Sequence, residues 1–588
     1  MNCKYPLTGL SFSILLGLGM QASPSSAATF TVNSTIDGVD AFKGDGVCAT
    51  LTGECTLRAA IQEANQYFRN FAIPRSSTII LPTGFYQLNI PKAGIGMRDT
   101  DGIGDLNIYH ELTIQGTDVA STIIDGGGLD RIFNIEAFTP DYLRKPLVAM
   151  SNLTLQNGFA SGTGNDDGGA MLIEDGSFVD LNNVIFRNNR AESSGGSIFL
   201  DGGYLTLNQN QIDGNTAAYG GGIAVRETQK ASTLRIEQTA INNNSASLGG
   251  GIGNLFGLVE IYNSTIGNNQ ATVTPNSDGG GIFNEGSAIL RNVTLSGNTA
   301  SRNGGAVYTQ AVRANFPNTG AFFTHSTIAN NSAGVSGGGV FGNTGRIGGN
   351  NSIFANNTSA ANPNCSGMLA VSGNNNLSND ESCRFSGEGN IVNVDPRLSP
   401  LANNGGFTLT HALQSGSPAI DAARDIYCSP QNTSFSEPRT RDQRGISRPA
   451  GTSCDIGAYE FAYLFSGFLL LNLDLLDFIT LPIWIPASAS SLDFVLDNSV
   501  AQIVGIELAE QGKWNSQISP DGRSARFNLF NLGQSNQNGF LVNIKIRRDR
   551  EGDVKLSVSN TQRVTEPSSI LGVAILAGYL IARKRNSH

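Results

Sequence analysis

Side chains that could support catalysis are few in the central part of this 588-residue chain. Between residues 150 and 360 there is one lysine, Lys230, and one histidine, His325. An adjacent acidic pair, Asp166-Asp167, stands directly before a Gly-Gly turn. A glycosidase needs two carboxyl groups about 5–9.5 Å apart, whereas neighbouring residues of a strand point to opposite faces. We therefore interpret this pair as a solvated turn.

A polysaccharide lyase would need a base beside its substrate and, as a rule, a cation such as calcium to neutralise the uronate. Four arginines could serve as that base: Arg226, Arg235, Arg291 and Arg313. Their spacing does not align them on one face. The sequence therefore does not locate a catalytic groove, and we keep a lyase or hydrolase as the alternative to a non-catalytic protein.

One loop has the spacing of a metal site. Asp99, Asp101 and Asp105 occupy positions 1, 3 and 7 of a glycine-rich segment, as carboxylates do in calcium loops. Position 5 is Ile103, and no glutamate stands at position 12. Calcium is the only cofactor that we consider, and an ordinary acidic turn is the alternative.

The elements that must position these residues follow from composition and periodicity. Glycine contributes 71 residues, charged residues only 15%, and the formal net charge is −10. This balance argues against a disordered chain and against nucleic-acid binding. A Gly-Gly-x-apolar element recurs about every 28 residues from residue 168 to residue 337. Glycine and asparagine at this density exclude helices, and the segments between them alternate as strands do.

A second element, apolar-x-x-Asn-x-Ala/Ser, runs between the glycine pairs. Its asparagines are Asn189, Asn215, Asn244, Asn269, Asn298, Asn331 and Asn357. Short strands, a fixed asparagine and a fixed glycine turn are typical of one rung of a parallel β-helix. Rungs stacked about 4.8 Å apart place each asparagine above the next, so we predict a structural ladder of side-chain amides.

These two elements resemble the repeats of polymorphic outer-membrane and pectate-lyase-like β-helices over about residues 140–360. The resemblance implies an all-β protein built on a right-handed parallel β-helix. Cys55-Thr-Leu-Arg-Ala-Ala-Ile-Gln-Glu-Ala-Asn65 resembles the CSLREA motif at the start of bacterial surface β-helices. Its apolar spacing fits a short amphipathic helix that covers the open first rung.

Two further regions follow the repeats. Between Val394 and Glu460, five ordered pieces such as Gly416-Ser-Pro-Ala-Ile-Asp421 and Asp442-Gln-Arg-Gly445 resemble a choice-of-anchor domain of the Q type. We interpret its charged residues as paired charges of a C-terminal cap. Alternating residues across 462–563 predict a smaller antiparallel β-sandwich that faintly resembles cohesin-type domains.

The cysteines indicate an oxidising compartment. Besides Cys3, six remain, and six cysteines allow 15 connectivities. They fall into sequence-local couples, so we predict nearest-neighbour pairing: Cys48 with Cys55, Cys365 with Cys383, and Cys428 with Cys454.

Both ends of the chain resemble export signals. Lys4, an apolar run and Ser26-Ala-Ala28 form a three-part signal for signal peptidase. Glu566-Pro567, an apolar run and Arg583-Lys584-Arg585 resemble a PEP-CTERM sorting segment. The resemblance implies an exosortase-like enzyme, transient membrane insertion of the C-terminal segment, and a final location outside a Gram-negative cell or on its outer surface. A plain tail anchor is the alternative.

The sequence thus predicts six regions: 1–28 signal, 29–69 cap, 70–392 β-helix, 393–461 anchor-type cap, 462–563 sandwich and 564–588 sorting segment. Long, polar and weakly charged faces suit adhesion or binding of extracellular polysaccharide. We favour a non-catalytic surface protein of that kind. A scaffold that binds a protein partner through the sandwich is a third hypothesis.

Overall fold

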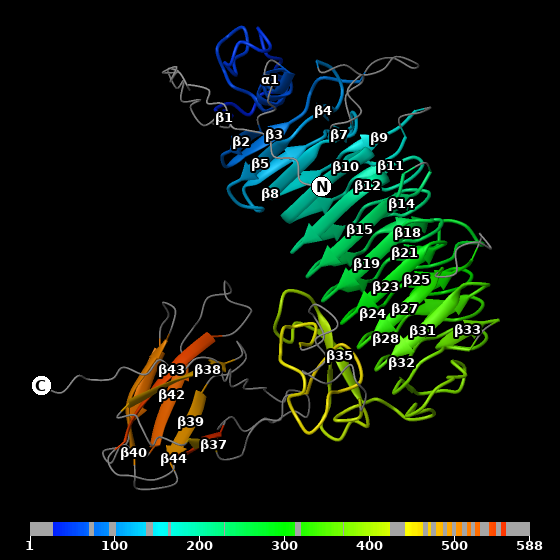
Figure 1. Cartoon of the computed structure of the whole chain (residues 1–588), viewed down its shortest axis with the longest axis vertical. Helices are drawn as coiled ribbons and strands as arrows, with labels where there is room; N and C mark the ends of the chain where they lie inside the picture. Colours follow the sequence, from blue (N-terminus) through cyan, green and yellow to red (C-terminus); the bar gives the residue numbers. More distant parts are fainter. Residues whose placement is uncertain are drawn as a thin grey trace, which may run out of the picture.

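The computed structural model describes residues 28–69, 76–92, 102–136, 145–162, 166–228, 230–311, 319–368, 370–423 and 441–461, together with strands between 469 and 559. The signal and sorting segments lie outside the described residues. The chain is mostly β, and its central part is a parallel β-solenoid (Figure 1).

Three ladders of parallel strands form the solenoid. Ladder A contains β1 (Ala28–Thr31), β2 (Ser77–Leu81), β5 (Leu112–Gly116), β8 (Leu147–Gln156), β10 (Met171–Arg187), β12 (Ile198–Asn208), β15 (Ser232–Glu237), β19 (Leu258–Tyr262), β23 (Ser287–Arg291), β27 (Gly320–Thr324) and β31 (Arg346–Asn350). Each strand between the first and the last pairs with the strand one turn earlier and the strand one turn later. This pairing explains why the sequence repeats once per turn.

Ladder B follows the glycine pairs. It contains β4 (Leu106–Ile108), β7 (Phe133–Ile135), the first parts of β10 and β12, β14 (Ile223–Arg226), β18 (Ile252–Leu255), β22 (Ile282–Asn284), β26 (Val307–Thr309), β30 (Val340–Gly342) and β33 (Cys365–Gly367).

Ladder C precedes the ladder asparagines. It contains β3 (Gly84–Gln87), β6 (Thr122–Asp125), the last parts of β8 and β10, β13 (Gln211–Asp213), β16 (Ala240–Asn242), β20 (Thr265–Gly267), β24 (Thr294–Ser296), β28 (Thr327–Ala329), β32 (Ile353–Ala355) and β34 (Leu377–Ser378). Two-residue strands continue from it: β9 (Phe159–Ala160) pairs with β11 (Arg190–Ala191), and β17 (Ser245–Ala246), β21 (Gln270–Ala271), β25 (Thr299–Ala300) and β29 (Ser332–Ala333) form a ladder of their own.

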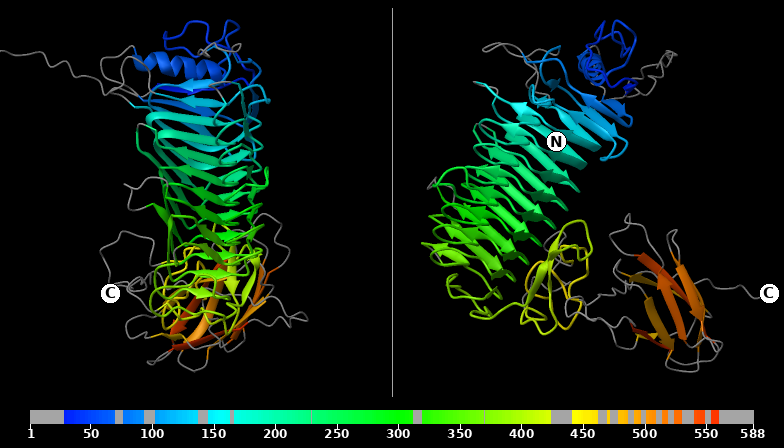
Figure 2. Two further views of the ribbon diagram at one scale, coloured as in Figure 1. Left: turned by 90° about the vertical axis from the view of Figure 1, so that its right-hand side faces the viewer. Right: turned by 180° about the vertical axis from the view of Figure 1, so that it is seen from behind.

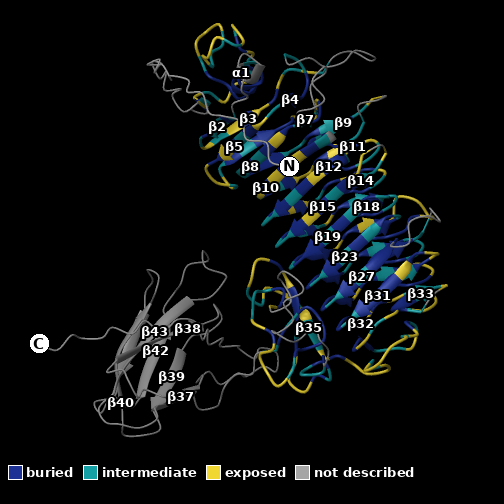
Figure 3. Cartoon of the chain, viewed as in Figure 1, coloured by how far each residue is buried: buried dark blue, intermediate teal, exposed yellow. Residues whose placement is uncertain are grey.

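Inward residues of the ladders stack into one apolar core. Leu205, Leu234 and Val259 occupy one register position of ladder A and are at most 1% exposed. In Figure 3 the solenoid strands are dark blue with teal and a few yellow positions, and most of the yellow positions lie on the turns. Alternation with period two therefore divides each strand between core and surface.

Each glycine of a pair has its own structural reason. Gly195 has a φ of +66°, a conformation that costs little only for glycine. Gly196 has no such φ, but a Cβ there would lie 2.0 Å from the carbonyl oxygen of Gly221 on the next turn. The first glycine makes the bend, and the second lets successive turns approach.

Helix α1 (Leu57–Arg69) lies across the N-terminal end of the solenoid (Figure 2). Its buried face contains Leu57, Ala60, Ile61 and Ala64, which belong to the same core as β1 and β2. The helix covers the first strands, whose unpaired edge would otherwise be open to pairing with another chain.

The region after the solenoid packs against its flank. Strands β35 (Leu398–Ala402) and β36 (Thr410–Leu413) form an antiparallel hairpin. Leu413, Ala419 and Ile456 share an apolar cluster with Ile353 of β32 and Leu377 of β34. We call residues 393–423 and 441–461 the flanking segment.

Two antiparallel sheets follow. One contains β37 (Leu469–Leu471), β44 (Val554–Ser559), β39 (Ser491–Leu496), β42 (Ser524–Leu529) and β41 (Trp514–Ile518), and the other β38 (Phe478–Ile485), β43 (Phe540–Arg548) and β40 (Ala501–Leu508). Their packing as a sandwich remains a prediction.

Candidate functional site

The predicted asparagines lie inside the solenoid, one above another. Asn269 Nδ2 donates to Asn298 Oδ1 at 3.0 Å and to the carbonyl of Ile241 at 2.8 Å. Its Oδ1 accepts from both the backbone N–H and Nδ2 of Asn244. The same side-chain bond joins every consecutive pair of the set Asn189, Asn215, Asn244, Asn269, Asn298, Asn331 and Asn357. These amides are fully used within the fold, so they offer nothing to a ligand.

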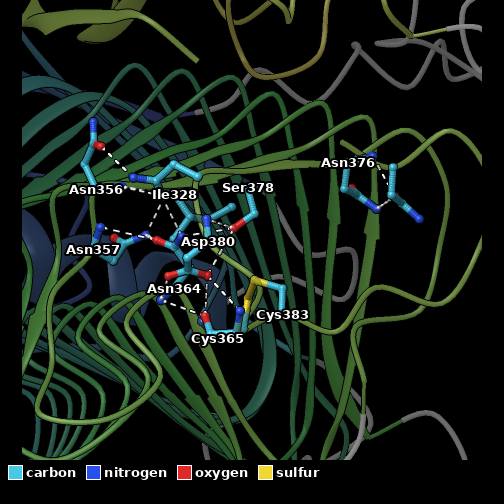
Figure 4. The surroundings of a disulfide bond; sticks show 12 residues. Ile328, Asn356, Asn357, Asn364, Cys365, Asn376, Ser378, Asp380 and Cys383 are labelled. Carbon is cyan, nitrogen blue, oxygen red and sulfur yellow. Dashed lines mark hydrogen bonds between the residues drawn. A yellow bond between two sulfur atoms is a disulfide. The ribbon is translucent and has the colours of Figure 1, made fainter. Parts of the chain in front are cut away.

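The asparagine ladder ends at a disulfide. Asn357 Nδ2 donates to Asn364 Oδ1 at 2.9 Å, and Asn364 in turn donates to Ser378 Oγ at 3.0 Å. Figure 4 shows this network beside the bond between Cys365 and Cys383. The crosslink therefore holds the last turn in the position that the amides require.

Residues beside the ladder were not predicted. The residue before each ladder asparagine has a positive φ; Asn243 and Gly297 are examples, at +56° and +70°. Asparagine and glycine tolerate this conformation best, so the recurring Asn-Asn and Gly-Asn pairs were a signal in the sequence. Further rows follow the same logic: Ser326 N–H donates to Ser352 Oγ, and Ser352 N–H to Asn376 Oδ1.

The CSLREA-like motif tethers the N-terminal loop. Arg58 Nε lies 2.6 Å from Asp37 Oδ1, and both side chains are 1% exposed. Arg58 also donates to the carbonyls of Gly104 and Asp105. Glu63 accepts the backbone N–H groups of Gly44 and Gly46, and burial raises the pKa of its carboxyl group. The polar side chains of Arg58 and Glu63 in this motif therefore have a structural role.

The predicted calcium loop is only partly described. Asp99 and Asp101 lie outside the described residues, whereas Asp105 is 2% exposed. Its carboxylate lies 3.0 Å from Arg131 Nη2 and accepts from Asn107 Nδ2 at 3.1 Å. These contacts would compete with a cation, and calcium binding stays a prediction. In the described part of the chain, no group of three or more metal-ligating side chains comes together.

The acids and bases considered for catalysis are dispersed. Asp167 Oδ1 accepts the backbone N–H of Ser194 at 2.9 Å, as a turn residue does. Arg226 pairs with Asp201 at 2.7 Å on ladder B. Arg235 and Arg291, on ladder A, both lie over the ring of Tyr262.

Among the described residues, the remaining candidate bases do not come together in one site. His325 is 2% exposed, with Nε2 3.0 Å from Asn351 Nδ2 and Nδ1 facing the carbonyl of Asp455 at 3.3 Å. Arg313 lies outside the described residues, and Lys230 stands on an exposed turn.

Two of the predicted disulfides are present, Cys48–Cys55 and Cys365–Cys383. Cys454 is also disulfide-bonded, and Cys428, its predicted partner, lies outside the described residues. Cys48–Cys55 joins the tethered loop to the residue that opens the CSLREA-like motif.

The flanking segment contains several buried charged side chains. Arg448 Nη1 lies 2.6 Å from Glu460 Oε2, and both side chains are fully buried. Asp455 lies against the same pair; burial and the nearby Glu460 carboxylate raise the pKa of its carboxyl group. Arg444 pairs with Asp442 at 2.5 Å and stacks on Tyr459. These residues were interpreted from the sequence as paired charges, and in the structure they pair with one another within the segment.

Outward-facing aromatic residues are the feature that the sequence interpretation missed. Phe283, Tyr308 and Phe341 occupy one register position of ladder B, with ring centroids 5.1 and 5.4 Å apart. Each directly follows the apolar residue of a Gly-Gly-x-apolar element, which was the available signal. Phe283 and Tyr308 are only 5% exposed, so this stack supports the ladder and is not a binding surface.

A second aromatic pair is open to solvent. Phe178 and Tyr204 are register partners on ladder A, with parallel rings 4.8 Å apart. They are 43% and 46% exposed. Large apolar side chains exposed side by side are the kind of surface that marks a binding site.

Comparisons with known proteins agree with the repeat. A family model described as the Chlamydia polymorphic membrane protein repeat matches residues 292–310, which contain β24, β25 and β26. Among curated proteins there is no match.

Two solved structures of proteins from Azotobacter vinelandii match part of this chain. The A-module of mannuronan C-5 epimerase AlgE4 is 15% identical, with 57% of this chain and 72% of that chain covered and a TM-score of 0.30. The A-module of AlgE6 is 17% identical, with 57% and 94% covered and a TM-score of 0.20. Within the described residues, none of the helices has the length and apolar character needed to cross a membrane.

Proposed function

We propose that this chain is an exported surface protein whose β-solenoid binds polysaccharide without converting it. The proposal has two parts, location and activity. They rest on different residues and are tested separately.

The observation that carries the activity part is the use of the charged side chains. On ladder B, Asp201 pairs with Arg226, and on the turns that precede this ladder Asp278 pairs with Arg302. Near the N-terminus, Asp105 pairs with Arg131. General acid–base catalysis needs such groups aimed at a substrate, whereas here each is turned toward a protein partner. What remains on the surface of ladder A is a set of neutral polar side chains, dispersed charges of both signs such as Arg235 and Glu260, and the open aromatic pair. Polar side chains beside an exposed ring suit recognition of hydroxyl groups.

The location part is supported by the disulfides and by the polymorphic membrane protein repeat. Disulfides persist in oxidising compartments. Signal peptidase and an exosortase-like enzyme would act on the two ends of the chain. Deleting residues 566–588 should release the protein or leave it in the periplasm. Unchanged surface labelling of the deletion variant would refute the sorting step.

One experiment separates binding from turnover. The purified mature protein is incubated with a panel of polysaccharides, with and without calcium, and both retention and product release are measured. Retention without new reducing ends or unsaturated uronate is expected. Product release above the blank on any substrate would overturn the non-catalytic proposal in favour of a lyase or hydrolase.

A further inference from the structure

The exposed aromatic pair of ladder A has one covered side and one open side. In register order, the outward residues are Leu147, Phe178, Tyr204 and Thr233. Because the rings are stacked along the ladder, Phe178 is flanked by Leu147 and by Tyr204. The second face of the Tyr204 ring turns toward the next strand, where the short side chain of Thr233 leaves it open. Tyr204 accordingly keeps 46% of its surface exposed.

Polar groups border this open ring face. Thr206 lies two residues beyond Tyr204 and Arg235 two residues beyond Thr233, so both share its outward surface. The guanidinium of Arg235 also lies over the ring of Tyr262 on the following turn, but its side chain is half exposed at 49% and carries five N–H donors. An apolar ring face beside a hydroxyl and a guanidinium matches the two sides of a pyranose, which has a face of C–H groups and a rim of hydroxyls.

The charges favour a neutral sugar. Asp180 is exposed two residues beyond Phe178, and Glu260 lies 3.8 Å from Arg235, so the surface carries both signs. The chain as a whole carries −10. A field of that sign repels polyanions such as uronates at long range. A neutral glycan escapes this repulsion.

We infer that the open face of the Tyr204 ring, next to the short side chain of Thr233, is a subsite for one pyranose ring of a neutral polysaccharide. The sugar stacks on Tyr204, and its hydroxyls bond to Thr206 and Arg235. This inference rests on the proposed function and adds the place of binding and the class of sugar. The rest of ladder A offers an extended surface for the neighbouring sugars of the same chain.

Two variants of the full mature protein test the subsite. Tyr204→Ala removes the ring. Thr233→Leu places a larger side chain against the open ring face and leaves Tyr204 itself unchanged. Phe85→Ala is the matched control, because Phe85 is a phenylalanine of β3 that is 50% exposed. Affinity electrophoresis in gels containing hydroxyethyl cellulose, xyloglucan or galactomannan measures binding, with alginate as the anionic comparison. Thermal unfolding is followed for every variant.

We expect both Tyr204→Ala and Thr233→Leu to bind at least 10-fold more weakly, with Phe85→Ala unchanged and the unfolding temperature of Thr233→Leu not lowered. If the pair serves only the ladder, Tyr204→Ala lowers the unfolding temperature and neither variant changes binding, which would overturn the subsite and leave the proposed function standing. Wild-type protein that binds none of the polysaccharides would instead refute the proposed function. Tighter binding of alginate than of the neutral glycans, or a dimer in sedimentation that the same variants abolish, would also overturn the inference.

Discussion

His411 Nε2 lies 2.9 Å from the hydroxyl oxygen of Ser296, although 115 residues separate them in the chain. His411 Nδ1 lies 2.7 Å from the carbonyl oxygen of Ser399. A carbonyl can only accept, so Nδ1 carries the proton and Nε2 accepts from Ser296. Ser296 belongs to β24 and His411 to β36. This contact is one of those that fix the flanking segment to ladder C.

Acid should loosen this contact. Burial lowers the pKa of His411, despite the opposing effect of the Ser399 carbonyl. The unfolded chain therefore binds a proton more readily than the folded one, and stability is lost as pH falls through about 6.5 toward the lowered value. We expect faster hydrogen exchange in residues 398–413 at pH 5 than at pH 7, after correction for intrinsic rates. His411→Asn should remove much of this dependence, and an identical pH response in that variant would contradict the assignment.

The carboxyl groups of Asp455 and Glu460 in the flanking segment should make stability depend on pH in the opposite sense. Burial, followed by repulsion from Glu460, raises the pKa of Asp455, and burial likewise raises the pKa of Glu460. The folded state then holds a proton that the unfolded chain releases near pH 4, so stability falls as pH rises above that value. Asp455→Asn should make the unfolding temperature less dependent on pH between 5 and 8. A pH dependence as steep as that of the wild type would refute this prediction.

The solenoid could be predicted because its causes are local and repeated. The bend at Gly195, the close approach at Gly196 and the amide of Asn215 recur in successive turns between residues 168 and 357, so their spacing is visible in one sequence. The predicted parallel β-helix is confirmed at the level of a parallel β-solenoid. Its handedness remains a prediction.

Tertiary contacts that do not recur with the repeat could not be predicted from the sequence. Nothing in the sequence places Gln443 beside Thr265, 178 residues away, yet its Nε2 donates to that hydroxyl at 3.0 Å. The ion pair of Asp105 with Arg131 was hidden for the same reason. The exposure of Tyr204 depends on which neighbours flank it along the ladder, and that is known only once the register is fixed.

Arg58 should be essential to the N-terminal cap. Removing one partner of a buried ion pair costs about 3–5 kcal/mol, because the other charge is left uncompensated. Arg58→Ala should therefore release the loop of residues 33–54 and expose it to proteolysis. Arg58→Lys keeps the charge but cannot reproduce the forked contacts with Asp37, so partial protection is expected. Lys43→Ala, on the same loop, is the control.

The second glycine of a pair should reject any side chain. In Gly196→Ala the new Cβ would meet the Gly221 carbonyl oxygen at 2.0 Å, and backbone cannot rotate away as a side chain can. Overpacking of this kind costs about 1–3 kcal/mol or more. Gly102→Ala is the control, because its Cβ would have Val39 Cγ1 as nearest neighbour at 3.7 Å. Equal unfolding temperatures for the two variants would contradict the close-approach argument.

The asparagine ladder should be sensitive in its middle. Asn269→Ala removes one amide and four hydrogen bonds with it: its Oδ1 accepts from the N–H and Nδ2 of Asn244, and its Nδ2 donates to the Ile241 carbonyl and to Asn298 Oδ1. Asn244 Nδ2 keeps its bond to the Ile212 carbonyl. Asn298 Oδ1 keeps the backbone N–H that Asn269 still provides at 3.0 Å. The Asn244 N–H loses the side-chain oxygen that it donates to, and a buried polar group left unsatisfied costs about 1–3 kcal/mol. A loss of that size is a sizeable share of the stability of a typical domain.

Because each turn contacts only its neighbours, the damage should begin locally. Hydrogen exchange in Asn269→Ala should accelerate first in β16, β20 and β24, and limited proteolysis should cut near the altered turn. Asn276→Ala, on an exposed turn of the same rung, should exchange like the wild type. If the two variants are equally stable, the amide ladder contributes nothing and apolar stacking alone holds the turns together.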